Sequence, residues 1–236
     1  MTERPRRAVA RDADRFEIGP SAVRWDGDSL VIDIRERSMP LGYKVAGRIR
    51  VSPRMIGTTA FALDPQARHR WHPVAPRARV EVEMTHPGVS WSGDGYFDSN
   101  FGDEALEDGF TEWHWSRAHL QDQVGVLYSG RRRDGQPFDL ALSCDHQGRW
   151  RDREVLPVAR LRRSNWLVER LTRADAGSSP RVAKTWIDAP FYARSAIDTR
   201  LWGEDVRAVH ESLSLTRFAS PVVQSMLPYR MPRAIF

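Results

Sequence analysis

The sequence GYFDSNFGDEALEDGFTEWHWSRAH, residues 95–119, decides how this chain can fold. It concentrates aromatic rings, carboxylates and imidazoles in one short segment. Its glycine, aspartate and asparagine residues disfavour a helix interior. Residues 89–98 have the composition of a strand that runs into a turn, and residues 110–119 that of a second strand. The segment therefore predicts two strands joined by an acidic loop at residues 103–108.

The same two-residue alternation extends outward in both directions. In residues 79–84, Val80, Val82 and Met84 alternate with charged side chains, as expected of a half-buried strand. Residues 1–15 are polar and are expected to be loosely ordered, and prolines 73 and 76 are expected to end a strand that starts at residue 68. Further strands are predicted at 22–25, 29–35, 44–51, 61–63, 123–129, 137–144, 155–161, 166–171, 182–187, 192–202 and 206–215. Only the tail, residues 222–227, indicates a helix, so the prediction is an all-β barrel or sandwich.

Composition narrows the class of protein. Of the 236 residues, 41% are hydrophobic and 28% are charged, as is usual for a soluble globular protein. No run approaches the ~20 apolar residues that a membrane-spanning helix needs. The basic start of the chain is not followed by an apolar core, so a signal peptide is not predicted. The single cysteine, Cys144, excludes an internal disulfide and is expected to be a buried filler.

The chain has a net charge of +5, and 34 of its 36 basic residues are arginine. Such a composition occurs both in proteins that bind nucleic acids and in proteins that lie against anionic lipid. However, the arginines are dispersed among 31 acidic residues, which argues against a nucleic-acid surface. The densest run, Arg131–Arg133, lies at a predicted hairpin tip. It is either a solvated turn or a contact with a membrane surface.

Several segments resemble the carotenoid 1,2-hydratases of purple photosynthetic bacteria, also called hydroxyneurosporene synthases. The resemblance covers most of the chain and is specific, because a whole set of motifs occurs in the same order. The matching segments are Gly95–Glu104, Glu112–Ala118, Phe16–Ala22, Val31–Ile34 and His69–Trp71.

The resemblance implies a fold of two lipocalin-like antiparallel β-barrels. It also implies the cofactor-free addition of water to the terminal double bond of acyclic carotenoids. In that family a His and a Trp two residues apart, and a Tyr and an Asp two residues apart, form the site. These match His69 with Trp71 and Tyr96 with Asp98 in this sequence.

One departure from the family concerns the start of the chain. Family members have a long N-terminal part ahead of the position that aligns with Met1. The first barrel is therefore expected to be incomplete, over residues 1–108, and the second to occupy residues 109–236. Either the sequence is a fragment or has a misplaced start, or the protein is a degenerate relative. An open first barrel would leave strand edges unpaired.

Hydration of an unactivated alkene requires a proton donor, and Asp98 is the predicted one. The ordinary pKa of an aspartate is about 3.9, and raising it to near neutrality costs about 4 kcal/mol, which an apolar pocket can impose. Tyr96 or His69 is expected to hold or relay the proton. Trp71 and Tyr96 offer electron-rich faces to a carbocation, and His69 can orient the attacking water. Residues two apart on a strand share a face, so both pairs could converge in one cavity.

Other roles for these residues stay open. Asp98 could start an Asx turn. His114, His119, Trp113 and Trp115 are expected to be structural, and Glu104, Glu107 and Asp108 to belong to a solvated loop. A metal at His69, His72 and Asp98 is disfavoured because Pro73 prevents a helical histidine pair.

Three functions are therefore compared. The first is a carotenoid hydratase in peripheral contact with the cytoplasmic side of the membrane where its substrate dissolves. The second is a polyene or lipid carrier that uses the same cavity without catalysis. The third is a related cyclase or isomerase, because fold alone does not select the reaction. The sequence leaves the oligomeric state and the preferred carotenoid open.

Overall fold

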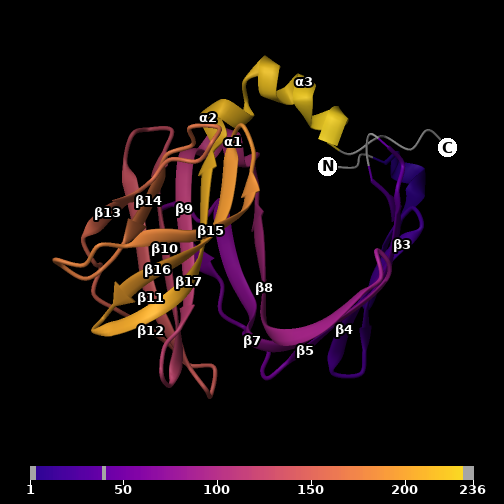
Figure 1. Cartoon of the computed structure of the whole chain (residues 1–236), viewed down its shortest axis with the longest axis horizontal. Helices are drawn as coiled ribbons and strands as arrows, with labels where there is room; N and C mark the ends of the chain where they lie inside the picture. Colours follow the sequence, from indigo (N-terminus) through magenta and orange to yellow (C-terminus); the bar gives the residue numbers. More distant parts are fainter. Residues whose placement is uncertain (1–3, 39–40, 231–236) are drawn as a thin grey trace. The chain divides into compact units, whose positions relative to one another are not determined.

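The computed structural model describes residues 4–38 and 41–230, and it is built almost entirely of antiparallel strands (Figure 1). The chain forms two compact units, each built from separate stretches of the sequence. Unit 1 comprises Met1–Gly57, Pro73–Asp98 and Gln224–Phe236, and unit 2 comprises Thr58–His72 and Ser99–Val223. The predicted all-β class is confirmed. The division into two barrels at residue 108 stays a prediction.

The first sheet has the order β1-β2-β3-β4-β5-β7-β6, and β8 pairs with β7. Leu30, Val51, Ala75 and Ala78 form its buried core within unit 1, with Phe97 packed against them. Every pairing whose register is defined is antiparallel. The strands are β1 Val9–Arg11, β2 Arg15–Ile18, β3 Ser21–Asp26, β4 Ser29–Arg37, β5 Lys44–Pro53, β6 Phe61–Ala62, β7 His69–His86 and β8 Val89–Gly102.

Two expectations for this sheet are wrong. Residues 9–11, which fall in the segment expected to be loosely ordered, form β1, because backbone pairing with β2 orders residues whose side chains are exposed. Residues 1–3 of that expectation lie outside the described residues. Prolines 73 and 76 do not end a strand but lie inside β7. They fall between the ladder that β7 forms with β6 at Arg70 and Trp71 and the ladder with β5 that starts at Ala78. A missing N–H is tolerated at such an interruption.

The second sheet belongs to unit 2 and has the order β12-β11-β10-β9-β17-β16-β15 (Figure 1). A separate pair, β13 and β14, completes the strands of this unit. Within the described residues, neither sheet closes into a barrel. The strands are β9 Phe110–His119, β10 Gln123–Arg132, β11 Pro137–Asp145, β12 Trp150–Asp152, β13 Val158–Leu161, β14 Arg170–Arg173, β15 Arg181–Asp188, β16 Tyr192–Leu201 and β17 Glu204–Ser214.

The strand predicted at residues 166–171 is largely wrong. The chain instead makes a tight loop there, in which Leu167 N–H donates to Ser164 O (2.9 Å) and Val168 N–H to Ser164 Oγ (3.2 Å). Leu167 has φ of 59°, a left-handed conformation that is rare for a branched side chain. Only Arg170 and Leu171 of the predicted segment join β14.

Strand β9 is central to the second sheet and is buried on both faces from Trp113 to Ala118. Ala118 faces an apolar core that includes Leu127, Ile197 and Leu201. Trp113, on the other face, packs against aromatic rings. Because both faces are buried, β9 separates two distinct interiors of unit 2.

Short helices accompany the strands: η1 Arg6–Ala8, α1 Leu106–Gly109, α2 Leu215–Phe218 and α3 Pro221–Arg230. The helix predicted in the tail is confirmed by α3. In the part of the chain that the structure describes, none of the helices has the length and apolar character required to cross a bilayer.

Candidate active site

Tyr96 and Asp98 lie on the same face of β8 and form a hydrogen bond. The Tyr96 hydroxyl donates to Asp98 Oδ2 over 3.0 Å, and both residues are half-buried. Phe97, between them, packs into the core of unit 1, so the tyrosine and aspartate side chains point to the opposite face. The spacing of two residues on a strand therefore produces the contact that the sequence predicted.

Gly95 allows β8 to approach its neighbour closely just before this pair. A Cβ at Gly95 would lie 2.1 Å from Val80 Cγ2, well inside van der Waals contact. Any side chain at position 95 would push β8 away from β7. The glycine thus fixes the depth at which Tyr96 and Asp98 are held.

His69 is positioned by two carboxylates of unit 2. Its Nε2 lies 3.0 Å from Glu104 Oε1, and its backbone N–H donates to Asp64 Oδ2 over 2.7 Å. The imidazole is only 2% exposed. Burial raises the pKa of Asp64, but N–H donors from His69, Arg68 and Gln66 outweigh it, so the pKa lies below its ordinary value. Asp64 is therefore a charged anchor for the start of β7.

Glu104 was expected in a solvated loop, and this expectation is wrong. Besides His69, it accepts a hydrogen bond from Arg68 Nη1 at Oε2 (2.7 Å). Gly109 leaves space for the contact, because a Cβ there would lie 2.4 Å from His69 Nε2. In the sequence, Glu104 is one glutamate of an acidic loop that follows Gly102. Its partner His69 lies 35 residues away, and the periodicity of a strand cannot reveal a contact between residues so far apart.

Trp71 is completely buried within unit 2 and lies in a cluster of aromatic rings. Its ring centroid is 5.5 Å from that of Phe61, 5.8 Å from that of Trp150 and 5.9 Å from that of Tyr128. The cluster extends to His69 through Phe110, at 4.8 Å. Edge-to-face pairs of this kind stabilise a rigid apolar wall.

The structure therefore gives two pairs of predicted site residues. Tyr96 and Asp98 belong to unit 1, and His69 and Trp71 belong to unit 2. The convergence of the two pairs in one cavity stays a prediction. Within the described residues, no group of three histidine, cysteine or acidic side chains is arranged to hold a metal ion.

The remaining histidines of the 95–119 segment have different environments. His114 is buried and its Nδ1 lies 3.0 Å from Ser212 Oγ. His210 is also buried, with Nδ1 2.8 Å from Ser116 Oγ and Nε2 3.0 Å from Ser212 Oγ. The two imidazole rings are parallel, with centroids 6.3 Å apart. His119 is exposed and interacts with Arg117 through Nε2 (3.2 Å).

Comparison with known proteins identifies the family. A family model described as carotenoid hydratase CrtC matches residues 1–235. This chain belongs to the CrtC family. It is 48% identical to an acyclic carotenoid 1,2-hydratase of Thiocapsa roseopersicina and 42% identical to one of Cereibacter sphaeroides, over 99% of its own length in both. The family resemblance noted in the sequence is therefore confirmed.

The chain spans 58% of the length of the Thiocapsa relative and 84% of that of the Cereibacter relative. Solved structures with similar folds have low sequence identity to this CrtC chain. An AttH candidate from Nitrosomonas europaea gives a TM-score of 0.62 at 13% identity, covering 89% of this chain and 72% of its own. CghA with Sch210972 gives a TM-score of 0.52 at 12% identity, and the match covers 84% of this chain and 68% of the CghA chain. These similarities concern the fold alone, which is the predicted lipocalin-like type.

Proposed function

We propose that this CrtC chain carries the residues for the 1,2-hydration of acyclic carotenoids. Two kinds of observation support the proposal: the chain belongs to the family, and Tyr96 holds Asp98 at 3.0 Å on a half-buried strand face. The relatives are named acyclic carotenoid 1,2-hydratases. The hydrogen bond carries most weight, because it ties the predicted acid to a defined geometry.

In the proposed reaction, Asp98 acts as the general acid. Its protonated carboxyl keeps Oδ2 as the acceptor for Tyr96 and carries the proton on Oδ1. Transfer of this proton to the less substituted alkene carbon, with the π electrons forming the new C–H bond, leaves a tertiary carbocation. Water then forms the C–O bond, and the proton that it loses returns to the Asp98 carboxylate, which restores the acid for the next turnover. A positioned acid contributes about 10²–10⁴-fold to such a reaction.

His69 and Trp71 have supporting roles in the proposal. The Trp71 ring and the Tyr96 ring present electron-rich faces, each worth roughly 1–2 kcal/mol to a desolvated cation. His69 orients the attacking water, and Glu104 orients His69 through the 3.0 Å contact with Nε2. Glu104 is thus a positioning residue rather than one that touches the substrate.

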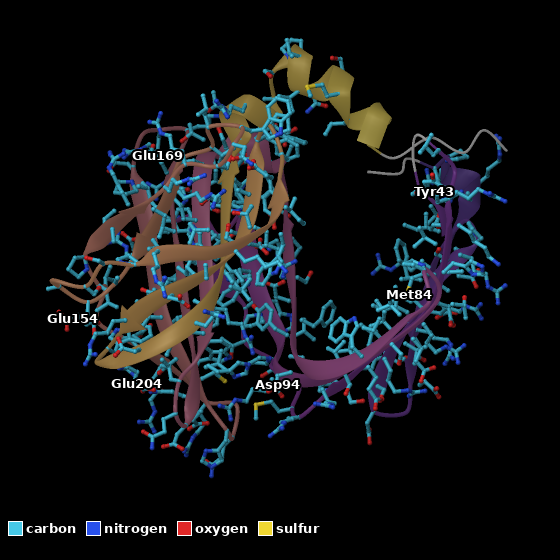
Figure 2. The ribbon with its side chains drawn as sticks, viewed as in Figure 1. Tyr43, Met84, Asp94, Glu154, Glu169 and Glu204 are labelled. Carbon is cyan, nitrogen blue, oxygen red and sulfur yellow. The ribbon has the colours of Figure 1, made fainter. Side chains whose placement is uncertain are left out.

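The test is the substitution Asp98→Asn, with Asp94→Asn as the matched control. Asp94 lies on the same strand, is exposed and is labelled in Figure 2. Asp98→Asn keeps the hydrogen bond to Tyr96 but has no acidic proton, so formation of the tertiary alcohol should fall at least about 100-fold. Normal turnover by Asp98→Asn would refute the assignment of the acid.

Product analysis separates the competing functions. A hydratase yields a product heavier than the substrate by one water. A cyclase or isomerase would yield a product of unchanged mass, and a carrier would bind carotenoid stoichiometrically without any product. We also propose peripheral contact with the cytoplasmic side of the membrane, because the substrate dissolves in the bilayer. For the hairpin at Arg131–Arg133 the sequence leaves two roles open, a solvated turn or a membrane contact, and neutralising all three arginines distinguishes them.

A further inference from the structure

A cavity of about 520 Å³ in unit 2 is lined by cationic side chains from two separate segments. Arg162, Arg163 and Arg170 come from the β13–β14 hairpin, whereas Arg181 and Lys184 come from β15. Asp188 is the one acidic residue among the described side chains that line it. The cavity therefore has a strong excess of positive charge.

Arg170 is the most buried of the cationic side chains that line this cavity. It is only 3% exposed, and its Nη1 donates to Thr185 Oγ1 and Ser195 Oγ, both at 3.1 Å. Its Nε has no hydrogen-bond partner among the described residues. The adjacent Glu169 lies at the outside of unit 2 (Figure 2), where it pairs with Arg160. A buried guanidinium whose hydrogen-bond acceptors are hydroxyls, even with the charge of Asp188 acting on it, is a strong donor for an incoming anion.

Three of the other four cations of the cavity lack acidic partners, whereas Arg181 pairs with Asp198 at 2.9 Å. Several arginines elsewhere in unit 2 are paired with carboxylates, as Arg173 is with Asp139 at 2.6 Å. In the described part of the chain, Arg162, Arg163 and Lys184 have no carboxylate within 4.0 Å. Asp188 already accepts the N–H groups of Asn165 (2.6 Å) and Trp166 (3.4 Å). The chain itself therefore leaves most of this charge uncompensated.

Exposed apolar side chains flank the cavity. Trp166 and Leu167 follow the lining residue Asn165 and are 46% and 63% exposed. Trp186 and Ile187 follow the lining residue Thr185 and are also exposed. Arg217 holds the first pair in place by donating to Trp166 O over 2.7 Å. Exposed tryptophans beside cations are typical of surfaces that lie in the interface of a membrane.

We propose that this cavity binds the phosphate headgroup of an anionic phospholipid. Arg170 donates to the phosphate oxygens from below, and Arg162, Arg163 and Lys184 surround them. Trp166, Leu167, Trp186 and Ile187 then enter the interfacial layer of the same bilayer. The apolar rim favours a lipid over a soluble phosphate compound, which would gain nothing from it. This inference is independent of the hydration chemistry, because binding to vesicles requires no carotenoid.

The test compares two triple variants that remove equal charge. R162Q/R163Q/K184Q removes three of the five cationic side chains that line the cavity, and R131Q/R132Q/R133Q removes the three of the hairpin. The hairpin is a fair control because its arginines are already engaged: Arg132 with Asp134 (3.3 Å), Arg131 with Gly135 O (3.0 Å) and Arg133 with Glu107 O (2.7 Å). Sedimentation with vesicles containing about one-third phosphatidylglycerol, and with pure phosphatidylcholine vesicles, measures the anionic contribution.

The cavity variant should bind anionic vesicles about 100-fold more weakly, while the hairpin variant should change less than about fivefold. Equal losses in both variants would indicate general charge attraction and overturn the proposal. A loss confined to the hairpin variant would overturn it as well. Circular dichroism confirms that each variant is folded.

A second measurement separates a lipid from a soluble ligand. Wild-type protein is titrated with glycerol 3-phosphate by calorimetry, and W166A/W186A is tested for vesicle binding. We expect W166A/W186A to bind vesicles at least about tenfold more weakly with glycerol 3-phosphate binding unchanged. Tight binding of glycerol 3-phosphate together with no vesicle binding by the wild type would assign the cavity to a soluble phosphate compound and overturn the lipid assignment.

Discussion

Unit 2 contains two sets of buried histidines that differ in the group each imidazole contacts. His69 Nε2 lies 3.0 Å from a carboxylate, Glu104, whereas the ring nitrogens of His114 and His210 lie near serine hydroxyls in the described part of the chain. His69 and His210 are almost equally buried, at 2% and 0% exposure. The comparison therefore separates the effect of burial from the effect of a charged partner.

Burial without a carboxylate keeps an imidazole neutral. Desolvation lowers the pKa of His114 to about 4, and desolvation together with the charges of His114 and Arg170 lowers that of His210 to about 3. A carboxylate, in contrast, can accept an N–H and compensate a positive charge on the ring. His69 is thus the buried histidine whose ring is oriented by a carboxylate, whereas the pair at 114 and 210 makes structural hydrogen bonds to serine hydroxyls.

The largest effect is expected in the stability of the hydroxyl-bonded pair. In the folded protein the pKa values of His114 and His210 both lie below the ordinary 6.5. At mildly acidic pH the unfolded chain therefore binds more protons than the folded chain. Stability is full above about pH 6.5 and should fall by about 4 kcal/mol towards pH 5. Urea unfolding at pH 7 and pH 5 measures the change.

The double variant H114Q/H210Q serves as the control for that pH effect. Glutamine can bond to the same serines but does not titrate in this range. The variant should be less stable at pH 7 but should lose the extra sensitivity between pH 7 and pH 5. An identical pH dependence in wild type and variant would show that other groups cause it.

The next largest effect is expected from crowding His69. Gly109→Ala places a Cβ 2.4 Å from His69 Nε2 and 3.1 Å from Glu104 Oε1. The imidazole must move, and a displacement of about 1 Å can cost about 100-fold in kcat/KM. Hydration assays of the folded fraction provide the measurement.

Gly93→Ala is the matched control for the crowding experiment. The nearest atom to a Cβ at Gly93 is 3.8 Å away, an ordinary contact. This variant should retain full activity. Equal activity in Gly109→Ala and Gly93→Ala would show that the position of His69 does not matter to the reaction.

The sequence predicted what is local in strand geometry. Alternation at Val80, Val82 and Met84 gave the correct face of β7, and the spacing of Tyr96 and Asp98 gave a contact that the structure contains. The prediction from the sequence failed where the pairing of strands in space overrides the conformational preference of individual residues. Prolines 73 and 76 are accommodated because β7 changes partner around them, and only the sheet order reveals this.

The parts of the site that the sequence missed depend on contacts between distant residues. Glu104 contacts His69, which lies 35 residues away in the sequence, and His114 contacts Ser212, which lies 98 residues away. Alternation assigns residues to two faces of a strand but does not say which face is solvated. Neither face of β9 is solvated, so His114 on one face and Trp113 on the other are both buried, but in different surroundings.

A smaller effect is expected from removing the charge beside His69. Glu104→Gln keeps a polar group near Nε2 but replaces a charged acceptor by a neutral one, so activity should fall about tenfold, the equivalent of one charged hydrogen bond. Ser212→Ala, beside His114, should leave activity unchanged. Unchanged activity in Glu104→Gln would show that the carboxylate does not position His69.

The smallest effect is expected at the outer partner of Glu104. Arg68 Nη1 lies 2.7 Å from Glu104 Oε2, but the arginine side chain is 50% exposed, so water and salt screen the interaction. Exposed ion pairs contribute about 0–1 kcal/mol, which predicts a loss of less than about threefold in kcat/KM for Arg68→Gln. Added salt should abolish even this difference, because wild type would lose the same contribution. A loss as large as that of Glu104→Gln would mean that Arg68 sets the orientation of the carboxylate, and the functional contact would then extend from His69 out to the surface.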